Sequence, residues 1–498
     1  MKRINFKDKK PNWQKEELLK MIKTKIIVTL GPSCSQKETI KSMIDNGVDI
    51  FRLNFSHGTL DAHAQLLENL NAVRAEHSHT TAVMGDLCGP KIRIGRIQPE
   101  GERLEVGGEV CIIHSEEQGN VNRFGTNYES FSKDVEIGHR VFIDDGQIAL
   151  RVIRKDEEQT VCEVLVGGPL HSRKGINLPD TNVRIPSITE RDWECVDWAV
   201  RHKVDFLALS FVRSSDEINQ LKDYLKKAGA DIKVVAKIET PQALTHLESI
   251  TKASDAVLIA RGDLGVEMDL AEVPVLQKRI TQSCRRLGKP VIVATQMLQS
   301  MIENPVATRA EVSDVANAIM DLTDAVMLSG ETSVGKYPIK AVQTVRRIAR
   351  VTEEYLHQDE HARIKTVTRD DLVLTAAIAR SIDQIVDDIS AKLVAAWSQT
   401  GSTVRLLSKE RINVPVLALS SDQRTCNQMS LYYGVIPRCQ PTPEDINQFI
   451  HIVEYLIISH NWARVGDKIV LVSGQPIGSA GATNAVMVHT ISNRQSPP

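Results

Sequence analysis

The chain has 498 residues, 42% hydrophobic and 25% charged, which is ordinary for a globular protein but too long for a single hydrophobic core. Its 61 lysines and arginines nearly balance its 63 aspartates and glutamates, so the charge gives no support for a nucleic-acid partner. The eight cysteines are scattered without a CxxC pair, which argues against a disulfide framework or a zinc knuckle and favours a reducing cytoplasm.

The first 22 residues form a lysine-rich polar leader that lacks the apolar segment of a signal peptide. No apolar run reaches the roughly 20 residues that cross a bilayer. We therefore expect a cytoplasmic protein with no membrane partner.

Runs rich in valine, isoleucine and leucine recur along the first two thirds of the chain. Most are separated by stretches with helical spacing, such as QKETIKSMIDNG and EINQLKDYLKKAG. Alternating strands and helices predict parallel strands, and eight such units predict an α/β fold of the (β/α)8 TIM-barrel type. The strands are expected at 25–31, 49–56, 81–87, 204–211, 232–239, 256–262, 290–296 and 325–331.

The third and fourth strands are separated by residues 88–203, far more than a barrel connection requires. Short alternating runs punctuated by glycine, such as QIALRVI and TVCEVLVGG, fill most of this stretch. They predict a small all-β domain inserted at 89–186. It hangs from Gly89-Pro90 and Ile185-Pro186 at the catalytic face, so we expect it to move as a lid that excludes water.

A third unit follows the barrel after the polar linker DEHARIKTVTRDD. Helical stretches alternate with the strands KLVAAWS, VPVLALS, KIVLVSG and AVMVHTIS, which predicts an open α/β sheet of about five strands. The expected domains are the leader at 1–22, the catalytic barrel at 23–88 and 187–355, the inserted domain at 89–186 and a C-terminal regulatory domain at 356–498.

Two expected strands end in paired opposite charges. In VVAKIE the alternation of a strand places Lys237 and Glu239 on one face, and in LIARGDLG it places Arg261 and Asp263 on one face. Glu239 and Asp263 suit a divalent metal as hard oxygen ligands. Lys237 and Arg261 suit a substrate anion. Structural salt bridges at strand ends are the alternative interpretation.

Most of the other strands also end in polar side chains. They are Arg52, Asn54, Ser56 and His57 after the second strand, then Asp86, Ser210, Thr295, Gln296, Ser329 and Glu331. Barrel enzymes place their sites at these carboxyl ends. Carboxylates for a metal, cations for phosphate and a hydroxyl for proton delivery suit phosphoryl transfer.

Several longer motifs occur together with these strand ends. They are KTKIIVTLGPSC, FRLNFSHG, GPKIR, SRKGINLP, VVAKIE, ARGDLGVE, ATQMLQSM, NPVATRAEVSDVANA and DAVMLSGET. With them the sequence resembles the pyruvate kinase family in order and over nearly the whole chain. The resemblance implies phosphoryl transfer from phosphoenolpyruvate to ADP, giving pyruvate and ATP in glycolysis, and a homotetrameric assembly.

The resemblance also implies roles for the residues at the strand ends. Glu239 and Asp263 would ligate Mg2+ or Mn2+. Lys237 would stabilise the phosphate and the developing enolate, and Arg52 would hold the transferring phosphoryl group. Thr295 would lie on the proton route to the enolate carbon.

Further residues are implied to contact the two substrates. The backbone N–H of Gly262, at the start of a helix, would face the substrate carboxylate. His57, Arg93 and Lys174, together with Asn54, would meet ADP or ATP.

A monovalent cation site is implied by the same likeness. Asn54, Ser56 and Asp86 match residues that hold K+ in a potassium-requiring branch of the family. That branch carries GPEIR, whereas this chain carries GPKIR, a bacterial type, with Lys91. The ammonium of Lys91 would replace the charge of K+, so we expect K+ to be dispensable. A solvated surface lysine is the alternative.

The stretch WSQTGSTVRLLSKE predicts an anion site at a helix N-terminus. Its residues are Ser398, Thr400, Gly401, Ser402 and Thr403. An ordinary capped turn is the alternative, but the stretch resembles the sugar-phosphate loop of regulated pyruvate kinases. Gln475 stands where forms regulated by fructose bisphosphate carry tryptophan, so we expect a sugar monophosphate or AMP as the phosphorylated effector.

Two other functions remain open at this point. One is a metal-dependent oxoacid lyase or aldolase on a β/α barrel, which would rarely need the large insertion. The other is a catalytically silent metabolite sensor, which would be expected to have lost some of Lys237, Glu239, Asp263 and Thr295. A coupled assay with phosphoenolpyruvate, ADP and Mg2+ separates the three functions.

Overall fold

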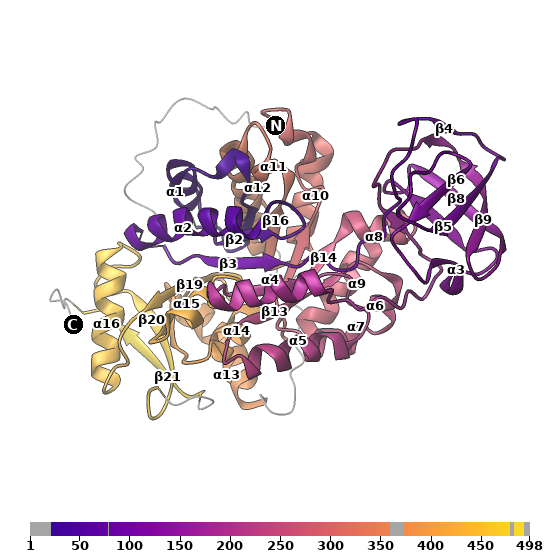
Figure 1. The fold of residues 1–498 in the computed structure, drawn as a ribbon. Coiled ribbons are helices and arrows are strands. Elements are labelled where there is room, and N and C mark those ends of the chain that lie inside the picture. The colour runs from indigo at the N-terminus through magenta and orange to yellow at the C-terminus, as the bar shows by residue number, and fades with distance from the viewer. Residues whose placement is uncertain (1–20, 78, 359–372, 479–482, 493–498) are drawn as a thin grey trace. The chain divides into compact units, whose positions relative to one another are not determined.

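The computed structural model describes residues 21–77, 79–358, 373–478 and 483–492 (Figure 1). Nearly all of the expected leader, and all of the expected linker after the barrel, lie outside the described residues. The chain forms two compact units. One comprises Ile26–Val342, and the other comprises Gln343 onward together with the residues up to Lys25.

The first unit contains a closed barrel with the strand order β1-β16-β15-β14-β13-β12-β3-β2. The strands are β1 (Lys25–Thr29), β2 (Ile50–Asn54), β3 (Ala82–Asp86), β12 (Phe206–Leu209), β13 (Lys233–Ile238), β14 (Ala256–Ala260), β15 (Val291–Ala294) and β16 (Ala325–Leu328). They are almost entirely buried, which explains why they read as continuous apolar runs. The predicted (β/α)8 barrel is confirmed.

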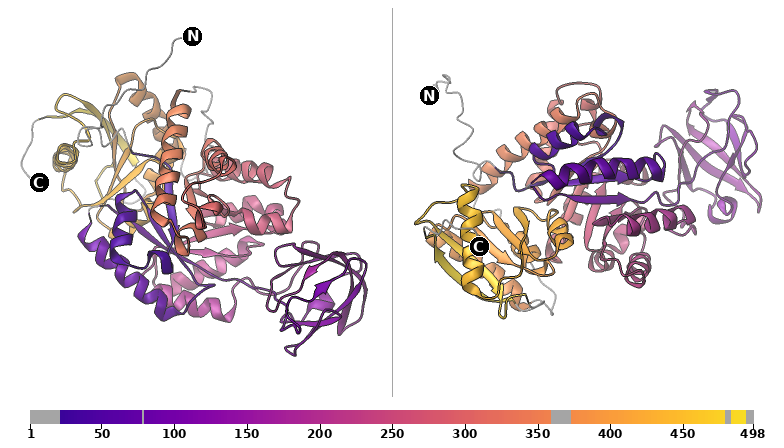
Figure 2. Two further views of the ribbon diagram at one scale, coloured as in Figure 1. Left: turned by 90° about the horizontal axis from the view of Figure 1, so that it is seen from above. Right: turned by 60° about the vertical axis from the view of Figure 1, so that its left-hand side comes forward.

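Helices connect the strands of the barrel and lie around it (Figures 1 and 2). They are α1 (Lys37–Asp45), α2 (Leu60–Glu76), α4 (Glu190–Arg201), α5 (Ser215–Lys227), α6 (Pro241–Thr245), α7 (Leu247–Ala253), α8 (Arg261–Glu267), α9 (Val273–Arg286), α10 (Arg309–Met320), α11 (Gly330–Ser333) and α12 (Pro338–Gln358). In the described part of the chain, no helix has the length and apolar character needed to cross a bilayer.

Four aspartates mark the amino ends of alternate barrel strands. Asp49, Asp205, Asp255 and Asp324 immediately precede β2, β12, β14 and β16. Each carboxylate accepts a backbone N–H at the start of the preceding barrel strand. The donors are Ile26 (3.0 Å), Val83 (2.8 Å), Val234 (2.8 Å) and Val291 (2.8 Å). These bonds satisfy strand-end amides and fix neighbouring strands in register.

The insertion between β3 and β12 folds around a hydrophobic core of its own, which includes Phe124 and Phe131. Its strands are β4 (Arg103–Leu104), β5 (Glu109–His114), β6 (Arg123–Thr126), β7 (Arg140–Ile143), β8 (Ile148–Lys155), β9 (Gln159–Val166), β10 (Gly168–Pro169) and β11 (Ile176–Asn177). Six of them form the sheet β11-β7-β8-β9-β5-β6, and β10 pairs with β4. One short helix, α3 (Phe131–Asp134), departs from the all-β expectation.

The second unit contains a five-stranded sheet in the order β19-β18-β17-β20-β21. Its elements are α13 (Val373–Ile389), β17 (Val394–Trp397), α14 (Ser402–Lys409), β18 (Val416–Ser420), α15 (Gln423–Met429), β19 (Val435–Cys439), α16 (Ile446–Ser459), β20 (Lys468–Gly474) and β21 (Thr483–Thr490). This unit contains two separate apolar clusters. Helix α13 contributes to one of them and α16 to the other. This confirms the expected open α/β sheet.

Removal of one strand-end aspartate tests its contribution to stability. Asp324 is fully buried and accepts the N–H of Val291. Asp324→Ala leaves that amide without this partner, so we expect the free energy of unfolding to fall by about 1–3 kcal/mol. Urea unfolding and hydrogen exchange in β15 measure the change. The exposed Asp223→Ala is the control, and equal stability of the two variants would contradict the role of Asp324.

Candidate active site

Lys237, at the end of β13, lies beside Glu239, which directly follows the same strand, and among acceptors at the ends of β3 and β12. Its Nζ is 2.8 Å from Oε1 of Glu239 and 3.4 Å from Oδ1 of Asp86. It also donates to Oγ of Ser210 over 2.7 Å. Burial opposes the charge, but the carboxylates of Asp86, Glu239 and Asp263 outweigh it and raise the pKa of Lys237. The ammonium is therefore charged and held from several sides.

Arg52 on β2 holds the other side of Asp86. Its Nε donates to Oδ2 of Asp86 over 2.6 Å, and its Nη1 donates to Oγ1 of Thr29 over 2.9 Å. Burial opposes ionisation of Asp86, yet the charges of Lys237 and Arg52 prevail and lower its pKa. The structure thus brings Arg52, Asp86 and Lys237 together, as their places at strand ends predicted.

The carboxylates of Glu239 and Asp263 fit a divalent cation. Burial and then Asp263 raise the pKa of Glu239, although Lys237 acts in the opposite direction. No group of three or more histidine, cysteine or acidic side chains suited to a metal occurs among the residues described. Mg2+ does not need such a group, because it commonly uses one or two carboxylates and completes its shell with water and substrate phosphate.

The strand expected at 256–262, whose alternation was extended to Asp263, ends earlier than expected. β14 ends at Ala260 and α8 begins at Arg261, so the alternation that placed Arg261 and Asp263 on one face is wrong. Arg261 donates to Oδ1 of Asp314 (2.7 Å) and to the carbonyl of Thr295 (2.8 Å). Its guanidinium holds the loop after β15, in place of the expected substrate anion.

Thr295 follows β15 in an unusual backbone conformation. Its φ is +67°, and that of Gln296 is +54°, two consecutive left-handed residues that are not glycine. Such strain occurs most often at functional sites. The hydroxyl of Thr295 accepts the N–H of Gly262 over 2.7 Å and donates to the carbonyl of Ala294 over 2.6 Å. Gly262 and Thr295 are therefore adjacent, and the N–H of Gly262 is directed to a side chain of the protein.

Lys91 reaches the residues expected to hold a monovalent cation. Its Nζ donates to Oγ of Ser56 over 3.0 Å, and the N–H of Ser56 donates to Oδ1 of Asn54 over 3.2 Å. Burial, followed by the charges of Lys237 and Arg93, lowers the pKa of Lys91. The ammonium is thus oriented toward these polar groups.

The residues expected at the nucleotide are more exposed. Burial and the charge of Lys91 lower the pKa of His57. In the inserted domain, Arg93 donates to the carbonyl of Arg173 over 2.8 Å. Lys174 pairs with Asp144 over 2.9 Å. Arg93 and Lys174 are therefore each tied to a different acceptor within the inserted domain, whereas Lys237 and Arg52 share the carboxylate of Asp86.

The hydroxyl-rich loop of the second unit lies directly before α14. Gly401 has φ of +75°, and the hydroxyls of Thr400 and Ser402 are 3.1 Å apart. Thr403 bonds to the hydroxyl of Thr483 over 2.6 Å. This contact was not predicted. Residues 479–482 of the distal loop that follows Gln475 are outside the described residues.

Three further residues were missed in the sequence. Asn177 of the inserted domain donates to Oε1 of Glu267 on α8 over 2.8 Å. Burial raises the pKa of Glu267 to about 7. Phe211, at φ of +52°, donates its N–H to Oε2 of Glu239 over 2.7 Å. No local pattern in the sequence singled them out, because both contacts join segments that are distant in the chain.

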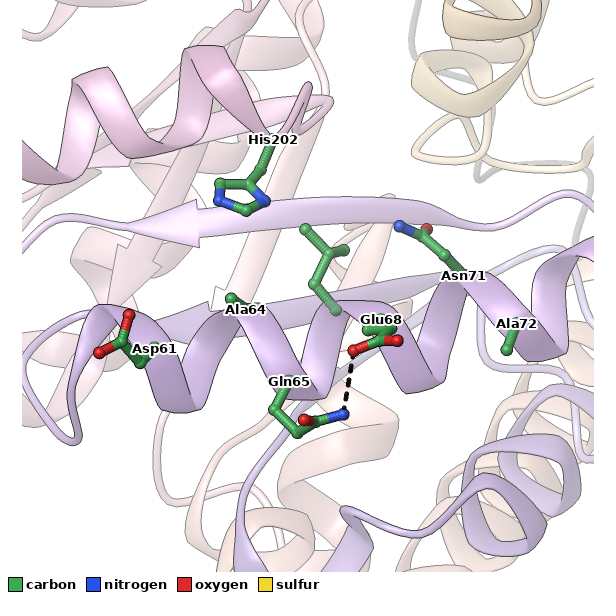
Figure 3. A pocket seen from close by; sticks show the side chains of 8 residues that line it. Asp61, Ala64, Gln65, Glu68, Asn71, Ala72 and His202 are labelled. Carbon is green, nitrogen blue, oxygen red and sulfur yellow. Dashed lines mark hydrogen bonds between the residues drawn. The ribbon is translucent and has the colours of Figure 1, made fainter.

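A hollow of about 700 Å³ lies away from this cluster, along α2 (Figure 3). It is lined by Asp61, Ala64, Gln65, Leu67, Glu68, Asn71, Ala72 and His202. Gln65 is hydrogen-bonded to Glu68 over 3.2 Å, and His202 stacks on Trp198. None of the predicted site residues lines this hollow.

The chain forms a closed parallel barrel, and cations and carboxylates gather at the carboxyl ends of its strands. These features define a β/α-barrel enzyme that acts on anionic substrates. The family model for the barrel domain of pyruvate kinase matches residues 21–342, and that for its alpha/beta domain matches residues 376–489. The chain belongs to the pyruvate kinase family. It is a phosphotransferase with pyruvate kinase function in glycolysis.

Individual relatives agree over almost the entire length. Pyruvate kinases of Thermococcus litoralis and Mycobacterium tuberculosis are each 40% identical to this chain, covering 94% of it and 98% of their own length. The crystal structure of a pyruvate kinase from Cryptosporidium parvum has a TM-score of 0.89 at 31% identity, covering 95% of this chain and 97% of its own. The family predicted from the motifs is confirmed.

The raised pKa of Glu267 predicts a pH-dependent loss of stability. The folded protein binds the proton more tightly than the unfolded chain, so stability falls as pH rises from about 4.5 to about 7. Glu267→Gln keeps an acceptor for Asn177 without the charge. We expect the variant to match wild type at pH 4 and to melt at a higher temperature at pH 8. Calorimetry measures both, with the exposed Glu272→Gln as the control. An equal difference at both pH values would contradict this assignment.

Proposed function

We propose that this enzyme transfers the phosphoryl group of phosphoenolpyruvate to ADP, giving pyruvate and ATP, with Mg2+ or Mn2+ held by Glu239 and Asp263. The largely buried ammonium of Lys237 beside Glu239, 2.8 Å away, carries the proposal. It places a fixed positive charge next to two carboxylates suited to a metal, which is the arrangement that phosphoryl transfer requires.

In the proposed reaction, the bond from phosphorus to the enol oxygen breaks and a bond to a β-phosphate oxygen of ADP forms. When bound, the divalent cation neutralises charge on the phosphoryl oxygens. Arg52 orients the phosphoryl group and Lys237 stabilises the enolate oxygen. A proton then reaches the methylene carbon by a route that includes the hydroxyl of Thr295. For the N–H of Gly262 to bind the substrate carboxylate, it must exchange its bond to Thr295.

Two rival functions fit these features less well. An oxoacid lyase or aldolase has no use for the cations Arg93 and Lys174 of the inserted domain. A silent sensor would not need Lys237, Glu239 and Asp263 as a group of interacting charges. A coupled assay with phosphoenolpyruvate, ADP and Mg2+ distinguishes the three, because only the proposed reaction yields both pyruvate and ATP.

Replacement of Lys237 tests the mechanism. Lys237→Met removes the preorganised charge, so we expect kcat to fall by about 10²–10³-fold or more. Steady-state rates measure the loss, and circular dichroism checks the fold. Lys252→Met, which removes a surface ion pair with Glu248, is the matched control and should keep its rate. Retention of a tenth of wild-type activity by Lys237→Met would refute the role of Lys237.

We propose that the enzyme is of the GPKIR type and works without K+. The contact between Lys91 and Ser56 supports this, because it brings an ammonium to the residues that match a K+ site, Asn54, Ser56 and Asp86. A fixed cation there supplies the positive charge for which K+ would otherwise be bound.

The activity in a buffer that contains only tetramethylammonium tests this proposal. We expect the wild type to keep nearly full activity without K+. Lys91→Met should lose activity in that buffer and regain part of it when KCl is added. Lys133→Met, an exposed lysine of the inserted domain, controls for the loss of one charge. A wild type that requires K+ would show that Lys91 does not replace the ion.

We propose the domain division 1–22, 23–88 with 187–355, 89–186 and 356–498, and that the inserted domain 89–186 acts as a lid. Arg93 and Lys174 from this domain, together with His57 and Asn54, would meet ADP or ATP. The bond between Asn177 and Glu267 supports a lid that contacts the barrel near Asp263. Movement of such a domain would exclude water during transfer.

We propose further that the protein is a cytoplasmic homotetramer. The outer edge of β21 has no neighbouring strand in the described sheet. Three consecutive residues of β21, Val486, Met487 and Val488, are 38–48% exposed. An unpaired apolar edge favours pairing with another chain, and a second copy is the simplest partner.

A phosphorylated metabolite is proposed as an activator that binds Ser398, Thr400, Gly401, Ser402 and Thr403. The hydroxyls of Thr400 and Ser402 lie side by side at the start of α14, whose free N–H groups favour an anion. Gln475 offers no ring or cation for a second phosphate, which favours a sugar monophosphate or AMP.

Saturation curves for phosphoenolpyruvate test this activator. We expect a sugar monophosphate or AMP to lower the half-saturating concentration about 5–150-fold, and fructose 1,6-bisphosphate to act less well. Thr400→Ala/Ser402→Ala should abolish the response and leave kcat unchanged. Ser381→Ala, on α13, is the control. If the double variant responds as wild type does, the loop is only a helix cap.

A further inference from the structure

The loop between β12 and α5 carries an unusual residue. Phe211 has φ of +52°, a region that bulky residues rarely adopt. In this conformation its N–H donates to Oε2 of Glu239 over 2.7 Å. Glu239 is 1% exposed, and its other oxygen faces Lys237. The backbone of Phe211 therefore fixes the direction of the Glu239 carboxylate.

The ring of Phe211 packs on the first connection to the inserted domain. A Cβ atom placed on Gly89 would lie only 2.8 Å from Cδ2 of Phe211 and 3.0 Å from Cβ of Ser210. The backbone N–H groups of Cys88 and Gly89 donate to Oδ1 of Asp192 over 2.8 and 3.3 Å. This connection is thus held between Asp192 on one side and Phe211 on the other.

The same loop also holds the second connection. The guanidinium of Arg213 donates to the carbonyls of Val183 and Ile185, the latter over 2.6 Å. Glu217 orients that guanidinium through bonds of 2.9 and 3.1 Å. The hydroxyl of Ser187 faces Oε1 of Glu217 at 2.5 Å and the carbonyl of Phe211 at 3.2 Å. Both ends of the inserted domain therefore meet one short loop.

We propose that the loop Phe211–Arg213 is a positioning element that couples both connections of the inserted domain to the carboxylate of Glu239. This rests on the proposed function, in which Glu239 holds the metal. A rotation of the inserted domain moves the backbone of its two connections, which the loop contacts. Close packing then transmits this displacement to the N–H of Phe211. Because coupling is reciprocal, a cation at Glu239 stiffens both connections.

Arg213→Lys separates this coupling from the metal site itself. Lysine keeps the charge but lacks the planar fork that holds two carbonyls at once. Mn2+ is the probe, titrated into the full-length enzyme without substrate and followed by electron paramagnetic resonance. We expect the Kd for Mn2+ to rise about three- to thirtyfold. Hydrogen exchange of residues 183–187 should slow on Mn2+ binding in wild type and respond little in the variant.

Arg140→Lys is the matched control, because it removes a similar pair of guanidinium hydrogen bonds within the inserted domain. Arg140 holds Asp180 through bonds of 2.9 and 2.7 Å, and neither bond involves the loop Phe211–Arg213. Arg140→Lys should bind Mn2+ as wild type does. If it weakens binding as much as Arg213→Lys, the effect is a general loss of stability and the inference is overturned.

Glu239→Gln distinguishes the failure of this inference from that of the proposed function. If Glu239→Gln binds Mn2+ normally, the assignment of the metal ligand is wrong. If Glu239→Gln loses Mn2+ while Arg213→Lys binds it like wild type, only the coupling is refuted. Should Arg213→Lys fail to fold, Phe211→Gly decides, because glycine tolerates the positive φ and keeps the N–H but removes the ring from Gly89. An unchanged Kd for Mn2+ in Phe211→Gly would then overturn the inference.

Discussion

The ammonium of Lys237 among buried carboxylates is the interaction on which the candidate site depends. Its distances to Glu239 and Asp86 are 2.8 and 3.4 Å, and Asp263 adds a third negative charge nearby. Charges taken out of water are tolerated only when they are paired and hydrogen-bonded. Glu239 directly follows β13, which carries Lys237, whereas Asp86 comes from β3 and Asp263 from α8. Closure of the barrel therefore brings Asp86 and Asp263 to Lys237. Asp86 also accepts from Arg52, so the charges of Arg52 and Lys237 are linked through one carboxylate.

The sequence was most informative where a side chain follows a regular strand. The apolar runs predicted the eight barrel strands, and the spacing of two residues placed Lys237 beside Glu239. The same rule failed at Arg261, because β14 had already ended and a helix had begun. The left-handed conformations of Phe211 and Thr295 were not predictable, since glycine and asparagine are the usual signals for positive φ and neither residue is one of them.

Contacts between distant segments also could not be predicted from local sequence patterns. The bond from Asn177 to Glu267 joins residues 90 positions apart, and the half-buried Glu267 looks like an ordinary helical glutamate in the sequence. β19 was not singled out because Pro437 interrupts its apolar run. Proline removes a backbone donor, which a sheet tolerates at its edge, and β19 occupies an edge. The family resemblance supplied the proposed chemical roles of Arg52 and Thr295, which the strand pattern left open.

The four strand-end aspartates group the eight barrel strands into four successive pairs, and one hydrogen bond joins the two strands of each pair. Three of these bonds span 21, 23 and 33 residues, but the bond from Val83 to Asp205 spans 122 because the inserted domain lies between them. Closing that longer loop costs about 1.5 kcal/mol more entropy than closing 23 residues. The difference shrinks once the insertion has collapsed on its own core and brought its two ends together. The order in which the barrel assembles is thus tied to the folding of a domain that contributes no strand to it.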